Sequence, residues 1–348
     1  MAKHELWELR QMQSLPLAAK VRMTENRIRD WVREFGEDGV YVSFSGGKDS
    51  TVLLHIVRSM YPDIEAVFVN TGLEYPEIQR FVKTFDNVTI LRPKMRFDEV
   101  LKKYGYPLIS KVVSNCVAGA RRKPGGFKHK QMRGEYVRGD GGESRFNYGR
   151  YEPLLDIDCK ISDACCNVMK KAPAKEFGNK TGKKPIIATM TCESKNREMV
   201  WLQTGCNAFE GKNAQSKPMS FWTEQDVLQY IKQEGIPIAP VYGDVVYEVD
   251  PDQMRIEDYG VEGCGTDKLV TTGCSRTGCI FCAFGCHLEK GESRFERLKK
   301  THPRQYEYCI GGGEYDQDGI WKPNKQGLGM GHVFDELNKI YGDGFIKY

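Results

Sequence analysis

Residues 40–54 read VYVSFSGGKDSTVLL, and this stretch decides the fold class. Its first five residues are β-formers with the length of a buried strand, whereas the residues from Thr51 onward have the apolar character of a helix. Two adjacent glycines between a strand and a helix let backbone N–H groups point at one anion, and the helix dipole favours negative charge there. The stretch therefore predicts a phosphate-binding loop at residues 45–50.

The residue types in this loop suit contacts with phosphate. The glycines permit close approach of the backbone, the lysine adds a compact positive charge, and the serines supply hydroxyl donors. The aspartate is expected to orient the loop or to hold Mg²⁺. The GxxxxGK[ST] spacing of a Walker loop is absent, and the alternative interpretation is a glycine turn that only joins a strand to a helix. The predicted contacts are Ser45, Gly46, Gly47, Lys48, Asp49 and Ser50.

Strand-like and helix-like segments alternate on both sides of this loop. Such alternation predicts an α/β fold: a parallel, twisted sheet with right-handed crossovers and helices on both faces. The expected strands are 40–44, 64–69, 88–91 and 185–191, and the expected helices are 16–35, 51–60, 76–85, 97–104, 193–202 and 222–233, the last capped by Thr223.

Beyond about Asp244 the periodicity is lost, and glycine, cysteine and charged residues dominate. The sequence therefore predicts three parts. They are an N-terminal helical segment at 1–39, an α/β domain at 40–243, and a cysteine-rich, metal-binding module at 244–348.

The composition excludes several classes of protein. Of 348 residues, 40% are apolar and 28% are charged, which is the balance of a folded soluble protein. The first residues carry charges and no apolar leader segment, and the longest apolar runs have only strand length, so we expect a cytoplasmic protein with no membrane contact. Twelve cysteines in a reducing compartment indicate metal or redox chemistry rather than a disulfide framework.

Four cysteines fall within residues 273–287, GCSRTGCIFCAFGCH. The pair Cys279-x-x-Cys282 has the spacing that lets two thiolates bind one metal centre. Thiolates suit zinc and iron–sulfur centres alike, so a zinc site formed by Cys274, Cys279, Cys282 and Cys286 stays open, with Cys264 as a further candidate. Packing is the alternative role, and it is the expected role of Cys116, Cys159, Cys192, Cys206 and Cys309.

The string SGGKDS resembles the PP-loop signature of ATP pyrophosphatases, whose families bind the pyrophosphate portion of ATP and act at its α-phosphate. Further segments resemble the phosphoadenosine phosphosulfate (PAPS) reductase family, in the family's order and over roughly residues 40–286. They are Asn70-Thr71-Gly72 before Tyr75-Pro76-Glu77, Asp163-Ala164-Cys165-Cys166 before Lys170 and Lys171, Glu193-Ser194 with Arg197, and the helix and proline turn at 218–242.

This resemblance implies a Rossmann-like HUP (PP-loop) fold and an adenine nucleotide ligand, either ATP with Mg²⁺ or adenylyl sulfate or PAPS. It places Lys48, Asp49 and Arg197 in catalytic roles. It also implies that the nucleotide site includes Asn70, Thr71, Gly72, Glu193, Ser194 and Arg197.

The resemblance also favours iron over zinc. Iron–sulfur members of the superfamily hold a 4Fe-4S cluster with adjacent cysteines and a later CxxC pair. Related DNA phosphorothioation proteins take their ligands from a late cysteine group, which keeps two further cysteines in reserve. The implied ligands are Cys165, Cys166, Cys279 and Cys282, with Cys274 and Cys286 as the reserve.

Two features depart from the reductases. Their nucleophilic cysteine lies in a C-terminal ECGLH-like element, whereas this chain ends GDGFIKY. Between Gly119 and Arg150 there are nine Lys or Arg against three Asp or Glu, interleaved with aromatic residues. Such an insertion suits phosphates and unpaired bases of tRNA or DNA, although a solvated loop has the same composition.

The leading hypothesis from the sequence is therefore adenylation of a nucleic acid followed by sulfur transfer from a donor that the sequence does not identify. One alternative is a reductase of PAPS or adenylyl sulfate. Another is a nucleotide-binding regulatory module with a structural metal site.

Overall fold

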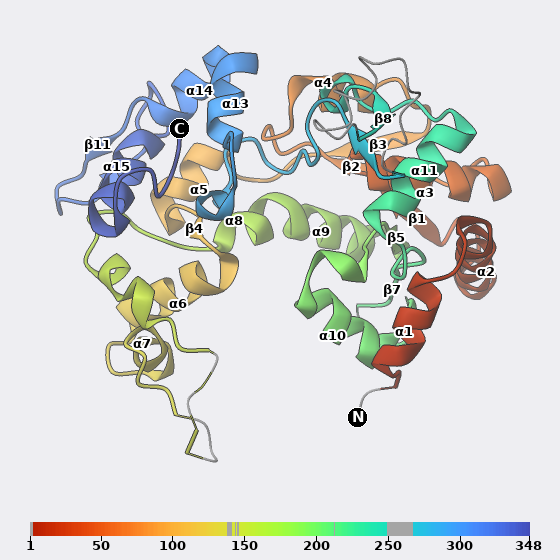
Figure 1. Ribbon diagram of the computed structural model, residues 1–348, viewed down its shortest axis with the longest axis horizontal. Coiled ribbons are helices and arrows are strands. Elements are labelled where there is room, and N and C mark those ends of the chain that lie inside the picture. Colours follow the sequence, from red (N-terminus) through yellow and green to blue (C-terminus); the bar gives the residue numbers. More distant parts are fainter. Residues whose placement is uncertain (1–2, 138–140, 143, 145, 212, 249–266) are drawn as a thin grey trace, which may run out of the picture. The chain divides into compact units, whose positions relative to one another are not determined.

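The structure is a computed structural model that describes residues 3–137, 141–142, 144, 146–211, 213–248 and 267–348 (Figure 1). The chain divides into two compact units. The first unit comprises Met1–Asn70, Glu74–Leu91 and Ala174–Thr277, and the second comprises Thr71–Leu73, Arg92–Pro173 and Gly278–Tyr348. The division of the sequence after residues 39 and 243 stays a prediction.

The first unit contains a six-stranded sheet with the order β3-β2-β1-β5-β7-β6. All neighbouring strands are parallel except β6 and β7. The prediction of an α/β fold with a mostly parallel sheet is therefore confirmed. The strands are β1 (Val40–Ser43), β2 (Ala66–Val69), β3 (Val88–Leu91), β5 (Lys184–Ile187), β6 (Asn207–Ala208) and β7 (Gln215–Ser216).

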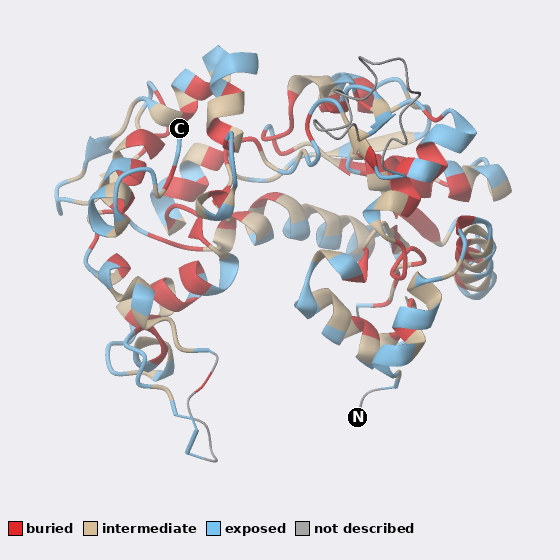
Figure 2. Cartoon of the chain, in the orientation of Figure 1, coloured by how far each residue is buried: buried red, intermediate tan, exposed pale blue. Residues whose placement is uncertain are grey.

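Strand β1 lies at the centre of this sheet. Its residue Val42 is paired with Ala66 of β2 on one side and with Ile186 of β5 on the other. All three side chains are buried, which explains why β1 and β2 read as continuous apolar runs rather than as alternating ones (Figure 2).

Helices and two late strands complete the first unit. Helices α2 and α11 are joined by a buried ion pair in which Lys20 Nζ lies 2.7 Å from Asp226 Oδ2. Thr223 caps α11 and forms a capping box with Asp226, as predicted. The elements are α1 (Leu6–Gln13), α2 (Leu17–Phe35), α3 (Lys48–Met60), α4 (Pro76–Val82), α10 (Lys195–Thr204), α11 (Glu224–Glu234), and the antiparallel pair β8 (Val245–Tyr247) and β9 (Leu269–Thr271).

The second unit is mainly helical. Its short strands pair as β4 with β10, in parallel, and β11 with β12, antiparallel. The elements are α5 (Phe97–Tyr104), β4 (Leu108–Ile109), α6 (Lys111–Arg122), α7 (Phe127–Met132), α8 (Ala164–Cys166), β10 (Ala283–Phe284), α13 (Arg294–Thr301), α14 (Pro303–Ile310), β11 (Glu314–Tyr315), β12 (Trp321–Lys322) and α15 (Met330–Tyr341). Helix α9 (Ala172–Thr181) begins in this unit and continues into the first.

The expectation that periodic structure ends near Asp244 is wrong, because α13, α14 and α15 follow. Helix α13 begins at Ser293, whose side chain accepts a hydrogen bond from the Glu296 amide in a capping box. On α15 the buried residues Met330, Val333, Phe334 and Leu337 have helical spacing. Both signals are present in the sequence, but the abundance of glycine and charge around them obscures the pattern.

The basic segment is not simply a loop inserted into the sheet domain. It holds the end of α6, the whole of α7, and the start of a 3-10 helix at Gly149–Leu155. Arg121, one of the nine basic residues of this segment, donates hydrogen bonds of 2.5–3.0 Å to four backbone carbonyls, those of Leu154, Leu155, Ile157 and Cys159. Its guanidinium therefore holds the chain after the 3-10 helix in place.

We expect Arg121→Glu to lower the free energy of unfolding by about 3–5 kcal/mol, because it leaves buried carbonyls unpaired and faces them with a carboxylate. The matched variant Arg122→Glu should change it by less than about 0.5 kcal/mol, since Arg122 is exposed. Urea denaturation of the two variants tests the assignment. Equal losses of stability in both would show that Arg121 is an ordinary surface residue.

No helix in the described ranges is long and apolar enough to cross a membrane.

Candidate nucleotide site and cysteine pocket

The predicted phosphate loop lies between the end of β1 and the start of α3. The strand order places β2 on one side of β1 and β5 on the other, so the direction of winding reverses there. Ligands of open α/β sheets bind at the carboxyl ends of the strands at such a switch point. Gly46 has a φ of +70°, and a Cβ atom there would lie 2.7 Å from Val82 and 2.8 Å from Ile78. Only glycine fits at this position.

The two loop serines hold the loop in shape. Their hydroxyl oxygens lie 2.9 Å apart, the Ser45 amide donates to Ser50 Oγ at 3.1 Å, and Ser50 Oγ donates to the Gly47 carbonyl at 2.9 Å. Gly47 is the N-cap of α3, and its amide donates to Ser45 Oγ at 3.3 Å. These bonds preorganise the turn, while a direct contact of either serine with phosphate stays a prediction.

Lys48 is buried, and three of its contacts come from segments far away in the sequence. Its Nζ donates to the Ser275 carbonyl at 2.7 Å and lies 3.0 Å from Glu224 Oε1. Its amide donates to the Tyr242 hydroxyl at 3.2 Å, and Tyr242 in turn shares a 2.9 Å hydrogen bond with Thr277. The loop at residues 272–277 therefore packs onto the phosphate loop, a contact that no local sequence signal revealed.

Asp49 has an atom whose environment indicates a missing ligand. Its Oδ1 is buried and has no hydrogen-bond partner among the described residues. Burial raises the pKa of Asp49, and the nearby charges of Lys48 and Arg276 lower it. A buried carboxylate oxygen without a partner is costly unless something binds it, so this atom fits the predicted role of holding Mg²⁺.

A cluster of charged side chains follows β5. Glu193 forms ion pairs with Arg197 and, at 2.9 Å, with Arg276. Burial lowers the pKa of Arg197, and the positive charge of Arg276 lowers it further. Ser194 accepts a hydrogen bond from the Arg197 amide as the N-cap of α10, so its hydroxyl has a structural role. Arg276 was not predicted, although it lies in the sequence between the reserve cysteine Cys274 and the predicted ligand Cys279.

The Asn70-Thr71-Gly72 element is divided between the two units. Asn70 follows β2 and belongs to the unit that holds the phosphate loop, and its amide donates to the Leu91 carbonyl at 2.9 Å. Thr71 and Gly72 belong to the second unit, where Thr71 Oγ1 accepts from the Leu73 amide at 3.1 Å. Their contact with a nucleotide stays a prediction.

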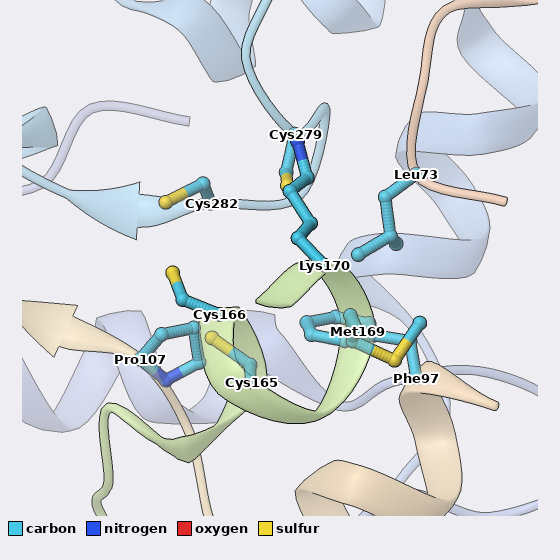
Figure 3. A pocket seen from close by; sticks show the side chains of 9 residues that line it. All are labelled: Leu73, Phe97, Pro107, Cys165, Cys166, Met169, Lys170, Cys279 and Cys282. Carbon is cyan, nitrogen blue, oxygen red and sulfur yellow. The ribbon is translucent and has the colours of Figure 1, made fainter. Parts of the chain in front are cut away.

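The second unit brings the four predicted cysteine ligands together in one pocket. Figure 3 shows Cys165 and Cys166 on the helix below, with Cys279 and Cys282 on the segment above. A single π-helical turn at Asn167–Lys171 follows the adjacent pair and widens the helix there. Such turns are frequent at functional sites. Lys170 also lines this pocket.

Within this pocket the surroundings favour the thiolate of Cys166, whereas the pKa values of Cys165 and Cys282 are raised. A hydrogen bond from Cys165 lowers the pKa of Cys166, and the charges of Lys111 and Lys170 lower it as well. The same bond to Cys166, together with burial, raises the pKa of Cys165. No three His, Cys, Asp or Glu side chains within the described ranges are arranged to hold a single metal ion. The four thiols line one pocket without forming a site for a single ion.

The reserve cysteines lie elsewhere. Cys274 is buried in the first unit, where its amide donates to the Val241 carbonyl at 2.9 Å. Cys286 is buried in the second unit, but it does not line the pocket, and its thiol donates to the Ala283 carbonyl at 3.0 Å. Cys264 lies outside the described residues. All described cysteines are free thiols, so the structure contains no disulfide there.

A mostly parallel sheet with a glycine-rich loop at its switch point is an arrangement typical of α/β nucleotide-binding proteins. The chain matches the phosphoadenosine phosphosulfate reductase domain over residues 39–112 and 142–284, which is more than half of its length. It belongs to this family, and the family that the sequence motifs indicated is confirmed.

Individual relatives are distant. The chain is 26% identical to sulfate adenylyltransferase subunit 2 of Shewanella frigidimarina over 268 residues, or 71% of this chain and 77% of that protein. It is 36% identical to the phosphoadenosine 5'-phosphosulfate reductase of Xylella fastidiosa over 73 residues, or 21% of this chain and 30% of that protein. A crystal structure of the phosphoadenylyl-sulfate reductase of Candida auris in complex with phosphate aligns with a TM-score of 0.37 at 12% identity. That alignment covers 79% of this chain and 98% of the other.

Proposed function

We propose that the chain is a sulfonucleotide reductase. It binds adenylyl sulfate, or the 3'-phosphorylated form, by its phosphates at residues 45–50 and reduces the sulfate group to sulfite. A dithiol reductant supplies the two electrons and is released as a disulfide, and the nucleotide leaves without its sulfate. The observation that carries this proposal is the pocket lined by Cys165, Cys166, Cys279 and Cys282. Four thiols in one pocket are a ligand set for redox chemistry, and the same chain has the predicted phosphate loop.

The four thiols fit a 4Fe-4S cluster better than a single zinc ion. Four cysteine thiolates are the ligand set of such a cluster. All four line one pocket, and no three of them are arranged to hold a single metal ion. When bound, the cluster would supply a redox-active centre of iron and sulfide. The positive charges of Lys111 and Lys170 stabilise the thiolate of Cys166, one of the four residues that would hold it.

The first unit supplies the groups that bind and orient the nucleotide. Lys48 neutralises phosphate charge, and a phosphate would compete with Ser45 and Tyr242 for the amides of Gly47 and Lys48 at the start of α3. Arg197 and Arg276 form a cationic pair for the sulfate group, and a nucleotide would compete with Glu193 for them. If the nucleotide binds together with Mg²⁺, Asp49 would contribute a carboxylate oxygen to the metal.

Adenylyl transfer from ATP is the second candidate function. The match over 268 residues to a sulfate adenylyltransferase subunit favours it, as does the orphaned Asp49 oxygen, which suits the Mg²⁺ that accompanies ATP. From the sequence alone we preferred a nucleic acid as the acceptor. The case for it is now weaker, because Arg121 of the basic segment donates hydrogen bonds to backbone carbonyls. A regulatory module would bind nucleotide without turnover.

Three parallel assays on protein purified without oxygen separate these functions. The first supplies adenylyl sulfate or PAPS with a dithiol reductant and measures sulfite. The second supplies ATP with sulfate, and the third ATP with tRNA or DNA, and both measure pyrophosphate. We expect sulfite in the first assay. Pyrophosphate in the second or third assay without sulfite in the first would replace the reductase by an adenylating enzyme, and nucleotide binding without any product would indicate a regulatory module.

A further inference from the structure

Residues 272–277 form a strap that lies against the phosphate loop, and both segments belong to the first unit. The base of the strap, residues 272–274, is fixed by its backbone. The amides of all three residues donate to carbonyls of residues 241–244 at 2.8–3.0 Å. A Cβ atom on Gly273 would lie 2.5 Å from the Val241 carbonyl oxygen, so the base packs closely on this turn. The base is therefore held in place without the phosphate loop.

The tip of the strap, its last three residues, is linked to groups of the phosphate loop instead. The Ser275 carbonyl accepts a hydrogen bond from Lys48 Nζ at 2.7 Å. Thr277 Oγ1 lies 2.9 Å from the Tyr242 hydroxyl, and that hydroxyl accepts from the Lys48 amide at 3.2 Å. A Cβ atom on Gly47 would lie 3.2 Å from the Tyr242 hydroxyl and 3.9 Å from Thr277 Oγ1. The tip and Tyr242 therefore cover the start of α3.

These contacts involve the donors that a phosphate loop offers to its anion. At a helix N-terminus the backbone amides point at the bound phosphate, and a lysine side chain adds a charge-assisted hydrogen bond. In this structure the Lys48 amide is bonded to Tyr242. Lys48 Nζ contacts the Ser275 carbonyl and, at 3.0 Å, Glu224. Phosphate oxygens would therefore compete with the strap for the same donors.

The tip can leave these donors without exposing a hydrophobic core. Ser275 and Arg276 are exposed. The ion pair of Arg276 with Glu193 measures 2.9 Å, but the Arg276 side chain is 62% exposed, and ion pairs that water reaches contribute little to stability. Directly after the tip, Gly278 has a φ of +43° and open space around the position of a Cβ atom. A glycine there allows the chain to change direction.

We propose that the strap is an autoinhibitory contact, which a nucleotide displaces with its phosphate group. The inference rests on nucleotide binding at residues 45–50, as the proposed function does, but not on the reaction that follows. Every anion must break the same contacts to reach the loop. Inorganic phosphate gains only the loop in exchange, whereas a nucleotide also gains contacts of its base and ribose. The strap therefore keeps free phosphate and sulfate from occupying the loop.

The first test is a gain of affinity in Tyr242→Phe, which keeps the ring but removes the hydroxyl that joins the strap to the Lys48 amide. We expect AMP and inorganic phosphate to bind about 3–10-fold more tightly in calorimetry, the effect of one competing hydrogen bond. Adenosine has no phosphate and should bind as it does to the wild type. The matched control is Tyr230→Phe, which loses a bond to His55 in the same unit and should leave all three affinities unchanged.

Two further measurements follow the strap itself. Thr277→Val detaches the tip from the other side of the same link, so its gain in affinity and that of Tyr242→Phe should not add. Brief trypsin digestion then reports the position of the tip, because Arg276 is exposed and mass spectrometry detects the peptide that begins at Thr277. AMP should accelerate this cleavage, whereas cleavage after the exposed Lys290 in the second unit should keep its rate.

The outcomes separate this inference from the proposed function. Weaker or unchanged AMP binding by Tyr242→Phe, additive gains, or protection of Arg276 by AMP would overturn the strap and leave the reductase in place. A wild type that binds AMP and shows these gains, but produces no sulfite, keeps the strap and loses the reductase. A wild type that does not bind AMP overturns both. Since the Tyr242 ring is retained, the variant should fold, and circular dichroism checks this.

Discussion

Replacement of Lys48 by alanine is expected to lower nucleotide-dependent turnover by about 10²–10³-fold, the loss typical of removing one preorganised contact to developing charge. The ammonium is buried at the start of α3 and lies 2.7 Å from the Ser275 carbonyl and 3.0 Å from Glu224. A bound phosphate would take the place of Glu224 as the partner of this charge. Steady-state kinetics of the proposed reduction, or of pyrophosphate release, measures the effect.

The variant should still fold. Removing Lys48 leaves Glu224 without its partner, but the Glu224 side chain is 49% exposed and water can solvate it. A matched control is Lys180→Ala on α9, which removes an exposed lysine outside the phosphate loop and should leave turnover unchanged. Wild-type turnover in Lys48→Ala would remove the phosphate loop from the mechanism.

Local sequence patterns predicted the sheet well. The strands at residues 40–44 and 88–91 are found within a residue of their expected bounds. Strand β1 is buried and reads as a short apolar run that needs no other signal, whereas β3 lies at the sheet edge and is only partly buried. The strand-to-helix position of residues 45–50 follows from the same pattern. Glycine was expected there for close approach of phosphate, and the structure adds a further reason, which is that Gly46 packs against α4.

The groups that complete the site were not predictable in this way. Tyr242 and Ser275 reach the phosphate loop from 194 and 227 residues away in the sequence. Arg276 reaches Glu193 from 83 residues away, and such contacts leave no periodic trace. For Arg121, composition alone was misleading. The composition of the segment suggested that its arginines face nucleic acid. Arg121 instead bonds to four backbone carbonyls, and this contact depends on the path of the chain after α7, which composition does not show.

The four cysteine ligands could be proposed only through family resemblance. More than a hundred residues separate Cys166 from Cys279, and spacing alone favoured a site within residues 274–286. The structure instead brings the adjacent pair and the CxxC pair to one pocket and leaves Cys274 and Cys286 out of it.

This arrangement leads to the prediction with the largest expected effect. Protein purified without oxygen should be brown and contain iron and acid-labile sulfide at about four each per chain. Cys279→Ser with Cys282→Ser should bleach it and abolish sulfite production, because a serine hydroxyl does not replace a thiolate as a soft ligand. AMP binding should be retained, since residues 45–50 belong to the other unit. Iron and sulfide analysis, visible absorption and calorimetry measure these three properties.

Cys286→Ser is the matched control, because Cys286 follows the CxxC pair closely but its thiol is bonded to the Ala283 carbonyl and does not line the pocket. It should keep the colour. Colourless anaerobic protein with one tightly bound zinc ion would contradict the cluster and leave a structural site. If colour survives Cys165→Ser with Cys166→Ser but not Cys286→Ser, the cluster stands with a different ligand set, and the pocket in Figure 3 is not where it binds.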